Sequence, residues 1–117
     1  MSRGMGEFEQ LLLFAVLRLG DKAYGVSIRR EIASRTGKDV AAGAVYTGLD
    51  RLQARGFVSS QEAETAPSRG GRRRKYYSLE PAGAAALEAS YTNVHSMADG
   101  MLDAVRAVAS AGDSGVA

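Results

Sequence analysis

The chain has 117 residues, of which 45% are hydrophobic and 24% charged, as expected for one soluble domain with its own core. It contains no cysteine and a single histidine, His95, which excludes disulfides and cysteine-ligated zinc and leaves little for a histidine-based metal site or catalytic triad. The net charge of +2 is unevenly distributed: residues 1–75 hold 14 basic and 8 acidic residues, whereas residues 76–117 hold 1 and 5, so we expect only the first part to meet a polyanion.

The first predicted helix covers residues 9–19, after a flexible N-terminus over residues 1–7. Its apolar run, residues 11–17, is too short for a membrane span and follows acidic rather than basic residues, so we expect a cytoplasmic protein with no membrane contact. The helix is apolar nearly all round and therefore needs cover on more than one side. In so small a domain we expect a second subunit to supply part of that cover, over Leu12 and Phe14.

Two further helices are predicted in the first half of the chain. One covers residues 24–35 and is capped by Gly37, and the next covers residues 42–55 and is closed by Gly56. In the latter helix three apolar residues recur at i, i+4 and i+7 and are expected to face the core: Val45, Leu49 and Leu52.

The pattern then changes to that of a β-hairpin. Strands are predicted over residues 57–60 and 72–79, joined by a tip rich in Gly, Pro and Ser. Pro81 fits the first turn of a long helix that ends near Ala109, and residues 110–117 are expected to be a disordered tail. This order predicts a mainly α winged helix-turn-helix domain over residues 8–80, with its antiparallel wing at 60–79, and an appended helix over 81–109.

Apolar residues recur along the appended helix at steps of three and four, which is typical of a coiled-coil seam. A helix of about 28 residues would extend about 42 Å, longer than so small a domain can cover. We therefore predict a homodimer, although the seam could also pack on the chain's own first helix. His95 lies one step off the seam and is expected to be exposed. The predicted interface comprises Leu12, Phe14, Leu87, Tyr91, Val94, Ala98, Met101, Val105 and Val108, and the seam begins at Ala84.

Four stretches, in register over about residues 9–90, resemble the PadR-like family of transcriptional regulators. They are Ala-Tyr-Gly-Val-Ser-Ile at 23–28, Gly-Ala-Val-Tyr-Thr-Gly-Leu-Asp-Arg-Leu at 43–52, Arg-Lys-Tyr-Tyr-Ser-Leu at 74–79 and Pro-Ala-Gly at 81–83. The resemblance implies a dimeric bacterial repressor that is released from its operator by a small molecule or another signal. The single helix after the wing is similar to that of the short-chain subgroup, in which it serves dimerisation.

The sequence departs from the family pattern at four positions. The family commonly has Ser or Thr at the position of Ala44, Pro at that of Thr47 and a basic residue at that of Asp50, and it has Thr where this chain has Glu80. Because the first three positions fall on the helix expected to read DNA, no base preference is carried over from the family.

The helix over residues 42–55 is the predicted recognition helix. With its apolar residues in the core, Gly43, Thr47, Asp50, Arg51 and Ala54 turn outward. Small residues at the N-terminus let backbone amides approach phosphate, and arginine can bond guanine edges. An ordinary solvated helix is the alternative. The expected DNA contacts of this helix are Gly43, Ala44, Tyr46, Thr47 and Arg51.

The wing carries a run of cations with no acid among them: Arg69, Arg72, Arg73, Arg74 and Lys75. Because strand residues alternate, this run makes both faces basic, which suits a hairpin lying along a phosphate backbone, although a solvated charged tip has the same composition. Tyr77 is expected to pack inward with Leu79, and Tyr76 to be half-exposed.

Together these features predict a sequence-specific regulator that binds a palindromic operator in double-stranded DNA. No nucleophile–base pair, carboxylate pair or phosphate loop is evident, so we predict no enzyme activity, cofactor or metal. One alternative is a winged-helix module that binds protein and not DNA. A nucleic-acid-processing enzyme is the other, and it would need clustered carboxylates for metal ions.

Overall fold

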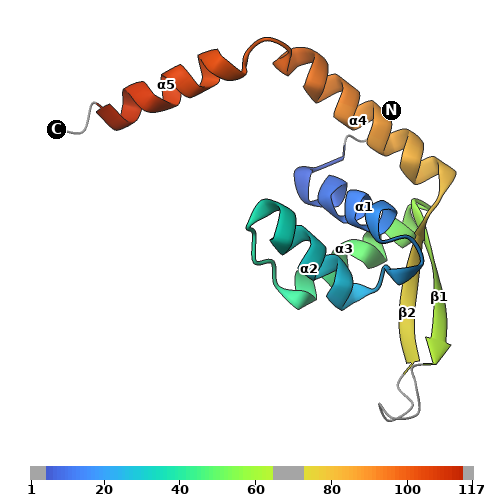
Figure 1. The fold of residues 1–117 in the computed structure, drawn as a ribbon. Coiled ribbons are helices and arrows are strands. Elements are labelled where there is room, and N and C mark those ends of the chain that lie inside the picture. Colours follow the sequence, from blue (N-terminus) through green and yellow to red (C-terminus); the bar gives the residue numbers. More distant parts are fainter. Residues whose placement is uncertain (1–4, 65–72, 115–117) are drawn as a thin grey trace. The chain divides into compact units, whose positions relative to one another are not determined.

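The computed structural model describes residues 5–64 and 73–114 (Figure 1). The elements in chain order are α1 (Glu7–Leu19), a 3-10 turn η1 (Gly20–Lys22), α2 (Gly25–Thr36), α3 (Ala42–Ala54), β1 (Val58–Glu64), β2 (Arg73–Leu79), α4 (Pro81–Ala98) and α5 (Leu102–Ser114). This order confirms the predicted fold class, mainly α with a two-stranded antiparallel hairpin. The chain divides into two compact units, Met1–Leu87 and Glu88–Ala117. No helix in the described ranges is long and apolar enough to cross a membrane.

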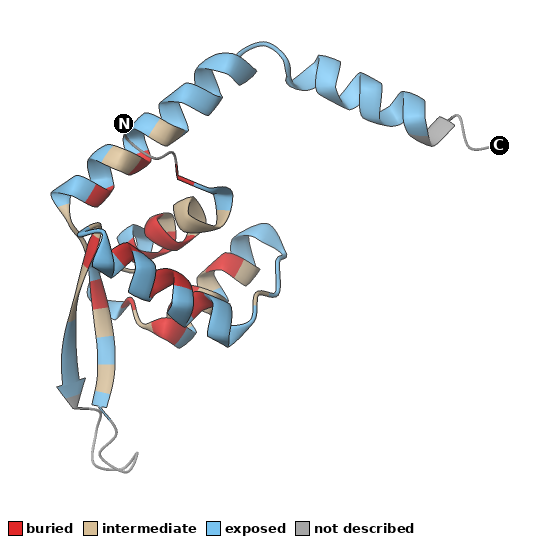
Figure 2. Ribbon diagram, turned by 180° about the vertical axis from the view of Figure 1, so that it is seen from behind, coloured by how far each residue is buried: buried red, intermediate tan, exposed pale blue. Residues whose placement is uncertain are grey.

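The first unit is built around the facing sides of α1, α2 and α3, whose buried residues are red in Figure 2. In α3, Val45, Leu49 and Leu52 are fully buried, as their spacing predicts. Gly48 is buried between them, and a side chain there would overlap Leu12 of α1, so this glycine lets the two helices approach closely. Because glycine has no Cβ, it fits at this close approach, although glycine otherwise weakens a helix interior.

Helix α1 is covered within its own chain, because α2, α3 and β2 all contact it. Leu12 is fully buried there, and Leu87 at the start of α4 is only 5% exposed. The predicted placement of these two residues in a dimer interface is therefore wrong: neither has surface left to offer a second subunit. Phe14 is half-buried against the same core.

The end of α3 shows how the chain turns from helix to wing. Gly56 has a φ of +79°, its N–H donates to the Gln53 carbonyl at 3.0 Å, and the Phe57 N–H donates to the Leu52 carbonyl at 2.9 Å. This pair of hydrogen bonds satisfies the last carbonyls of the helix, and the left-handed backbone favours glycine. The structure thus confirms the predicted closure of this helix at Gly56, directly before β1.

The two strands pair antiparallel from Val58 opposite Leu79 to Glu64 opposite Arg73. Strand β1 is longer than the predicted 57–60, because pairing with β2 holds residues that lack an alternating pattern of their own. Tyr77 is buried and Tyr76 half-buried, which confirms their predicted orientations. The predicted hairpin tip, including Arg69 and Arg72, lies outside the described residues.

The N-terminal prediction is wrong for residues 5–7. Met5 is buried in the core, Gln10 donates to its carbonyl at 3.1 Å, and α1 already begins at Glu7. The apolar side chain of Met5 gains from burial, which a composition rich in glycine does not reveal. Residues 1–4 lie outside the described part of the chain.

The single long helix predicted over 81–109 is also wrong. It begins at Pro81 as predicted, but the chain leaves helical geometry after Ala98 and re-enters it at Leu102. Gly100 between them has a φ of +73°, a left-handed backbone that glycine adopts freely. Helix α5 then continues to Ser114, so residues 110–114 are not a disordered tail, and residues 115–117 lie outside the described ranges.

Candidate nucleic-acid interface

Helix α3 presents one small, polar face to solvent. Gly43, Ala44, Thr47, Asp50 and Arg51 are all exposed, while the opposite side of the helix is buried. The N-cap residue is alanine and makes no side-chain capping hydrogen bond, and no side chain larger than a methyl group stands at residues 41–44. The first turn of α3 is therefore sterically open to a polyanion, and its exposed backbone amides suit a phosphate group.

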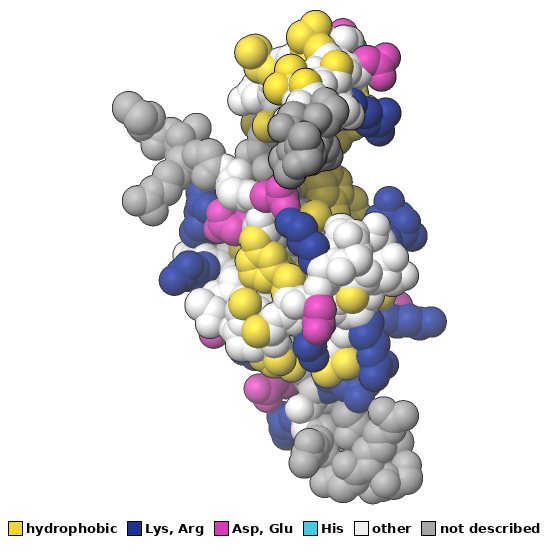
Figure 3. Space-filling model, turned by 90° about the vertical axis from the view of Figure 1, so that its left-hand side faces the viewer, with side chains coloured by type: hydrophobic (Ala, Val, Ile, Leu, Met, Phe, Trp, Pro, Cys, Tyr) yellow, Lys and Arg dark blue, Asp and Glu magenta, His cyan; other side chains and the backbone are white. Residues whose placement is uncertain are grey.

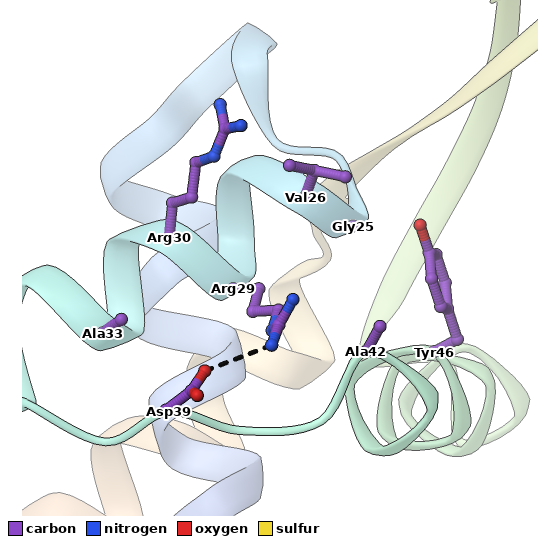
Figure 4. Close-up of a pocket in the computed structure, with 8 residues that line it drawn as sticks. All are labelled: Gly25, Val26, Arg29, Arg30, Ala33, Asp39, Ala42 and Tyr46. Carbon is purple, nitrogen blue, oxygen red and sulfur yellow. Dashed lines mark hydrogen bonds and ion pairs between the residues drawn. The ribbon is translucent and has the colours of Figure 1, made fainter.

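Tyr46 lies on the flank of that face, where α3 approaches the start of α2 (Figure 4). Its ring occupies the space beside Gly25, because a side chain on Gly25 would overlap the Tyr46 hydroxyl and ring carbons. Tyr46 nevertheless remains 46% exposed. A depression of about 300 Å³ opens beside these residues, between α2 and α3.

Arg29 stabilises the segment between α2 and α3. Its Nε donates to the Val40 carbonyl at 2.6 Å, and its Nη2 pairs with the Asp39 carboxylate at 3.1 Å (Figure 4). The side chain thereby fixes the segment that leads into α3. This role is not evident from the sequence, because a basic residue on an amphipathic helix is usually solvated.

Asp50 lies on the side of α3 that faces the wing. Burial raises the pKa of the Tyr77 hydroxyl, and the nearby charges of Asp50 and Tyr46 raise it further. Tyr77 therefore stays un-ionised, and an acidic side chain stands beside it on the exposed surface. The exposed surface of α3 near the wing is thus not uniformly basic.

The cations of the wing are separated by the hairpin pairing. Arg73 and Lys75 share one face of β2, where Glu62 is the register partner of Lys75 and the Glu62 carboxylate lies 3.7 Å from Arg73. Arg74 points to the other face and lies over the ring of Tyr24. The run of cations contains no acidic residue in the sequence, but pairing with β1 places Glu62 beside it. Figure 3 shows Lys and Arg side chains spread over one side of the molecule, with acidic side chains among them.

The second unit carries an exposed apolar surface. Val94 of α4 and Met101, Val105 and Val108 in and beside α5 are between 51% and 74% exposed, and Tyr91 is 51% exposed. A shallow apolar depression on α5 is lined by Met101, Ala104, Val105, Val108 and Ala109. Hydrophobic side chains at the α5 end are visible in Figure 3. His95 is exposed, as predicted, and stacks on Tyr91 with ring centres 5.3 Å apart.

No group of three or more potential metal ligands (His, Cys, Asp or Glu) occurs among the described residues. Within residues 5–64 and 73–114, the features that remain are an open helix face, a basic hairpin and an apolar surface. These are features for binding macromolecules.

Comparison with known proteins identifies similar molecules. Residues 13–89 match the model of the transcriptional regulator PadR-like family. A PadR family transcription regulator from Clostridium difficile R20291 is 27% identical, with a TM-score of 0.67 over 86% of this chain and 99% of that one. PadR-type regulators from Bacillus cereus strain ATCC 14579 (19% identity, TM-score 0.63, 84% and 89% covered) and Eggerthella lenta DSM 2243 (23%, 0.61, 82% and 84%) share the fold. Among proteins of curated function, none matches.

Proposed function

Because the chain belongs to the PadR-like family of transcriptional regulators, we propose that it is a homodimeric repressor of a palindromic operator in double-stranded DNA. The exposed face of α3 carries this proposal: its core side is fully buried, while Gly43, Ala44, Thr47 and Arg51 are free to meet a duplex. A helix of this kind fits the major groove, which is about 12 Å wide.

In this proposal the residues of α3 have different roles. Amides near Gly43 and Ala44 approach a phosphate, and the Tyr46 hydroxyl donates to another. Thr47 and Arg51 lie further along the exposed face, where side chains of their length reach base edges. Sequence choice therefore resides in Thr47 and Arg51.

The wing, residues 60–79, supplies affinity without sequence choice. Arg73 is 65% exposed, so it can exchange its ion pair with Glu62 for phosphate, and Lys75 is also exposed. An exposed ion pair contributes about 0–1 kcal/mol, so little is lost in that exchange. Arg69 and Arg72, outside the described residues, belong to the same proposed set.

The second unit supplies the dimer contact. Its exposed apolar side chains would gain about 25 cal/mol for each Å² that a second subunit covers. The proposed interface keeps Tyr91, Val94, Ala98, Met101, Val105 and Val108 of the second unit and the half-buried Phe14 of the first unit, and it leaves out Leu12 and Leu87. A two-fold dimer presents two copies of α3, which matches the symmetry of a palindrome.

The protein would work in the cytoplasm by binding alone, without catalysis or a cofactor. A repressor of this kind is released when a small molecule or another signal favours a state that does not fit the operator. The alternative function, a winged-helix module that binds protein, predicts no salt-sensitive DNA binding.

Selection of bound duplexes from a random library tests the proposal. We expect enrichment of a palindrome whose half-sites are centred about one helical turn, roughly 10 base pairs, or a multiple of it apart. The chain with Thr47→Ala and Arg51→Ala serves as the matched control and should enrich a less defined site. No enrichment by the parent, together with binding that is insensitive to salt, would favour the protein-binding module.

A further inference from the structure

Strand β2 has a second neighbour besides β1. The Tyr77 N–H donates to the Ala23 carbonyl at 2.8 Å, and Tyr24 and Tyr76 form an isolated antiparallel bridge. The residues just before α2 are therefore paired with the edge of the wing that faces the helices. The backbone joins the base of the wing to the helix-turn-helix at this point.

Three side chains reinforce that junction: Arg74, Tyr24 and Tyr76. The guanidinium carbon of Arg74 lies 4.0 Å from the centre of the Tyr24 ring, and the two tyrosine rings meet edge to face at 5.6 Å and 70°. A hydrogen bond with Tyr76 raises the pKa of Arg74. All three residues are partly buried. A guanidinium that is stacked and hydrogen-bonded in this way has a defined orientation.

Tyr24 connects this cluster to the recognition helix. Its N–H donates to the Ser27 hydroxyl at 2.9 Å, which fixes Tyr24 at the start of α2. The next residue, Gly25, contacts the Tyr46 ring of α3. A continuous set of contacts thus runs from Arg74 in the wing through the start of α2 to α3.

Arg73, the residue before Arg74 in β2, has different surroundings. It points to the opposite face of the hairpin, is 65% exposed and, among the described residues, forms a loose ion pair with Glu62. Arg74, in contrast, is committed to aromatic partners inside its own unit. Two adjacent arginines that look equivalent in the sequence therefore stand in different environments.

We propose that Arg74 is a positioning residue, which holds the wing at a fixed angle to α3 by stacking on Tyr24, and not a phosphate contact. The inference rests on the proposed function, because a wing and a recognition helix must reach one duplex in fixed register. It also assigns to Tyr24 a role in DNA binding without contact to DNA.

The first test uses the free protein and needs no DNA. Amide hydrogen exchange is measured at Tyr77, whose N–H joins the wing to Ala23, and at Leu49 in the core of α3. We expect Arg74→Ala, Arg74→Lys and Tyr24→Leu each to speed exchange at Tyr77 by roughly 2- to 30-fold, the range of a cation–π contact. Lysine keeps the charge but lacks the planar group that stacks.

Matched control variants show whether a change in exchange at Tyr77 comes from the contact between Arg74 and Tyr24. Tyr24→Phe keeps the ring and Arg73→Ala lies on the other face, so neither should alter exchange at Tyr77. Adding Arg74→Ala to Tyr24→Leu should have little further effect, because Tyr24→Leu already removes the ring on which Arg74 stacks. Unchanged exchange at Tyr77 in Arg74→Ala, or equal acceleration at Leu49, would overturn the proposal, since the second result indicates general destabilisation.

The second test measures affinity for the selected duplex against salt concentration. Arg73→Lys should keep most of the affinity, because a phosphate contact needs only charge, whereas Arg74→Lys should weaken binding as much as Arg74→Ala. Arg73→Ala should lower the slope of log affinity against log salt by about 1.8 per dimer, and Arg74→Ala should leave it unchanged. Normal binding by Arg74→Lys with a lowered slope in Arg74→Ala would overturn the proposal. A parent that binds no DNA would refute the proposed function, and hydrogen exchange would still decide whether Arg74 holds the wing.

Discussion

At the scale of single residues, Gly25 and Tyr46 form a close contact between α2 and α3. Gly25→Ala would place a methyl group where the Tyr46 ring lies. Overpacking of this kind costs about 1–3 kcal/mol, so we expect the free energy of unfolding to fall by that amount. Chemical denaturation measures it.

The matched control is Gly43→Ala, since open space surrounds a Cβ at that position. Its free energy of unfolding should equal that of the parent or exceed it by up to about 1 kcal/mol, because alanine has the higher helix propensity. Equal stability of both variants would show that Tyr46 moves aside without cost.

Arg51 and Thr47 carry the second prediction, which concerns base choice. Arg51→Ala should reduce discrimination at one operator position by about 1–3 kcal/mol, the value of a bidentate contact to a base. Thr47→Ala should act at a different position. Competition binding with single-base variants of the selected duplex measures both effects. An equal loss of affinity for every sequence would identify these residues as phosphate contacts.

The core of α3 and the contact between Arg74 and Tyr24 differ in how far the sequence predicts them. Val45, Leu49 and Leu52 repeat with the helical period, so their burial follows from local spacing. Arg74 and Tyr24 are 50 positions apart, and Glu62 meets Lys75 only through the register of the hairpin. Contacts of this kind depend on tertiary structure, so the charge run in the sequence overstated how basic the wing is.

At the scale of elements, the wing is expected to act through charge. Arg73→Ala combined with Lys75→Ala removes at most four phosphate contacts per dimer. The slope of log affinity against log salt should then fall by at most about 3.6, with similar loss for specific and random duplexes. Fluorescence anisotropy over a salt series measures it.

Ser78→Ala is the control for the wing, because Ser78 is exposed on the same strand and carries no charge. Its salt slope should equal that of the parent. An unchanged slope in the double variant would show that Arg73 and Lys75 do not reach DNA.

The break between α4 and α5 marks the limit of element prediction from hydrophobic spacing. Apolar residues continue across it at steps of three and four, so their pattern indicates one helix. The backbone instead takes a left-handed conformation at Gly100, which side-chain spacing does not report. Caps carried by glycine, at Gly37 and Gly56, were predictable because each follows the last apolar residue of a periodic segment.

At the scale of the whole molecule, the apolar surface of the second unit is expected to join two chains. Val94→Asp combined with Met101→Asp places charges on this surface, which is strongly disfavoured once a subunit covers it. Both residues are exposed in the single chain, so the fold should persist. Sedimentation should show a dimeric parent and a monomeric variant.

Ser96→Asp is the control for this prediction, since Ser96 is exposed on the opposite side of α4. It should remain dimeric. A parent that sediments as a monomer at micromolar concentration would contradict both the interface and the symmetric operator.

Sequence-specific binding through α3 is tested most directly by one ratio: the dissociation constant for a duplex with scrambled half-sites, divided by that for the selected duplex, at physiological salt. For the parent chain we expect this ratio to reach at least about 1,000, as is typical of specific regulators. A ratio near one would contradict the assignment of α3 as a recognition helix.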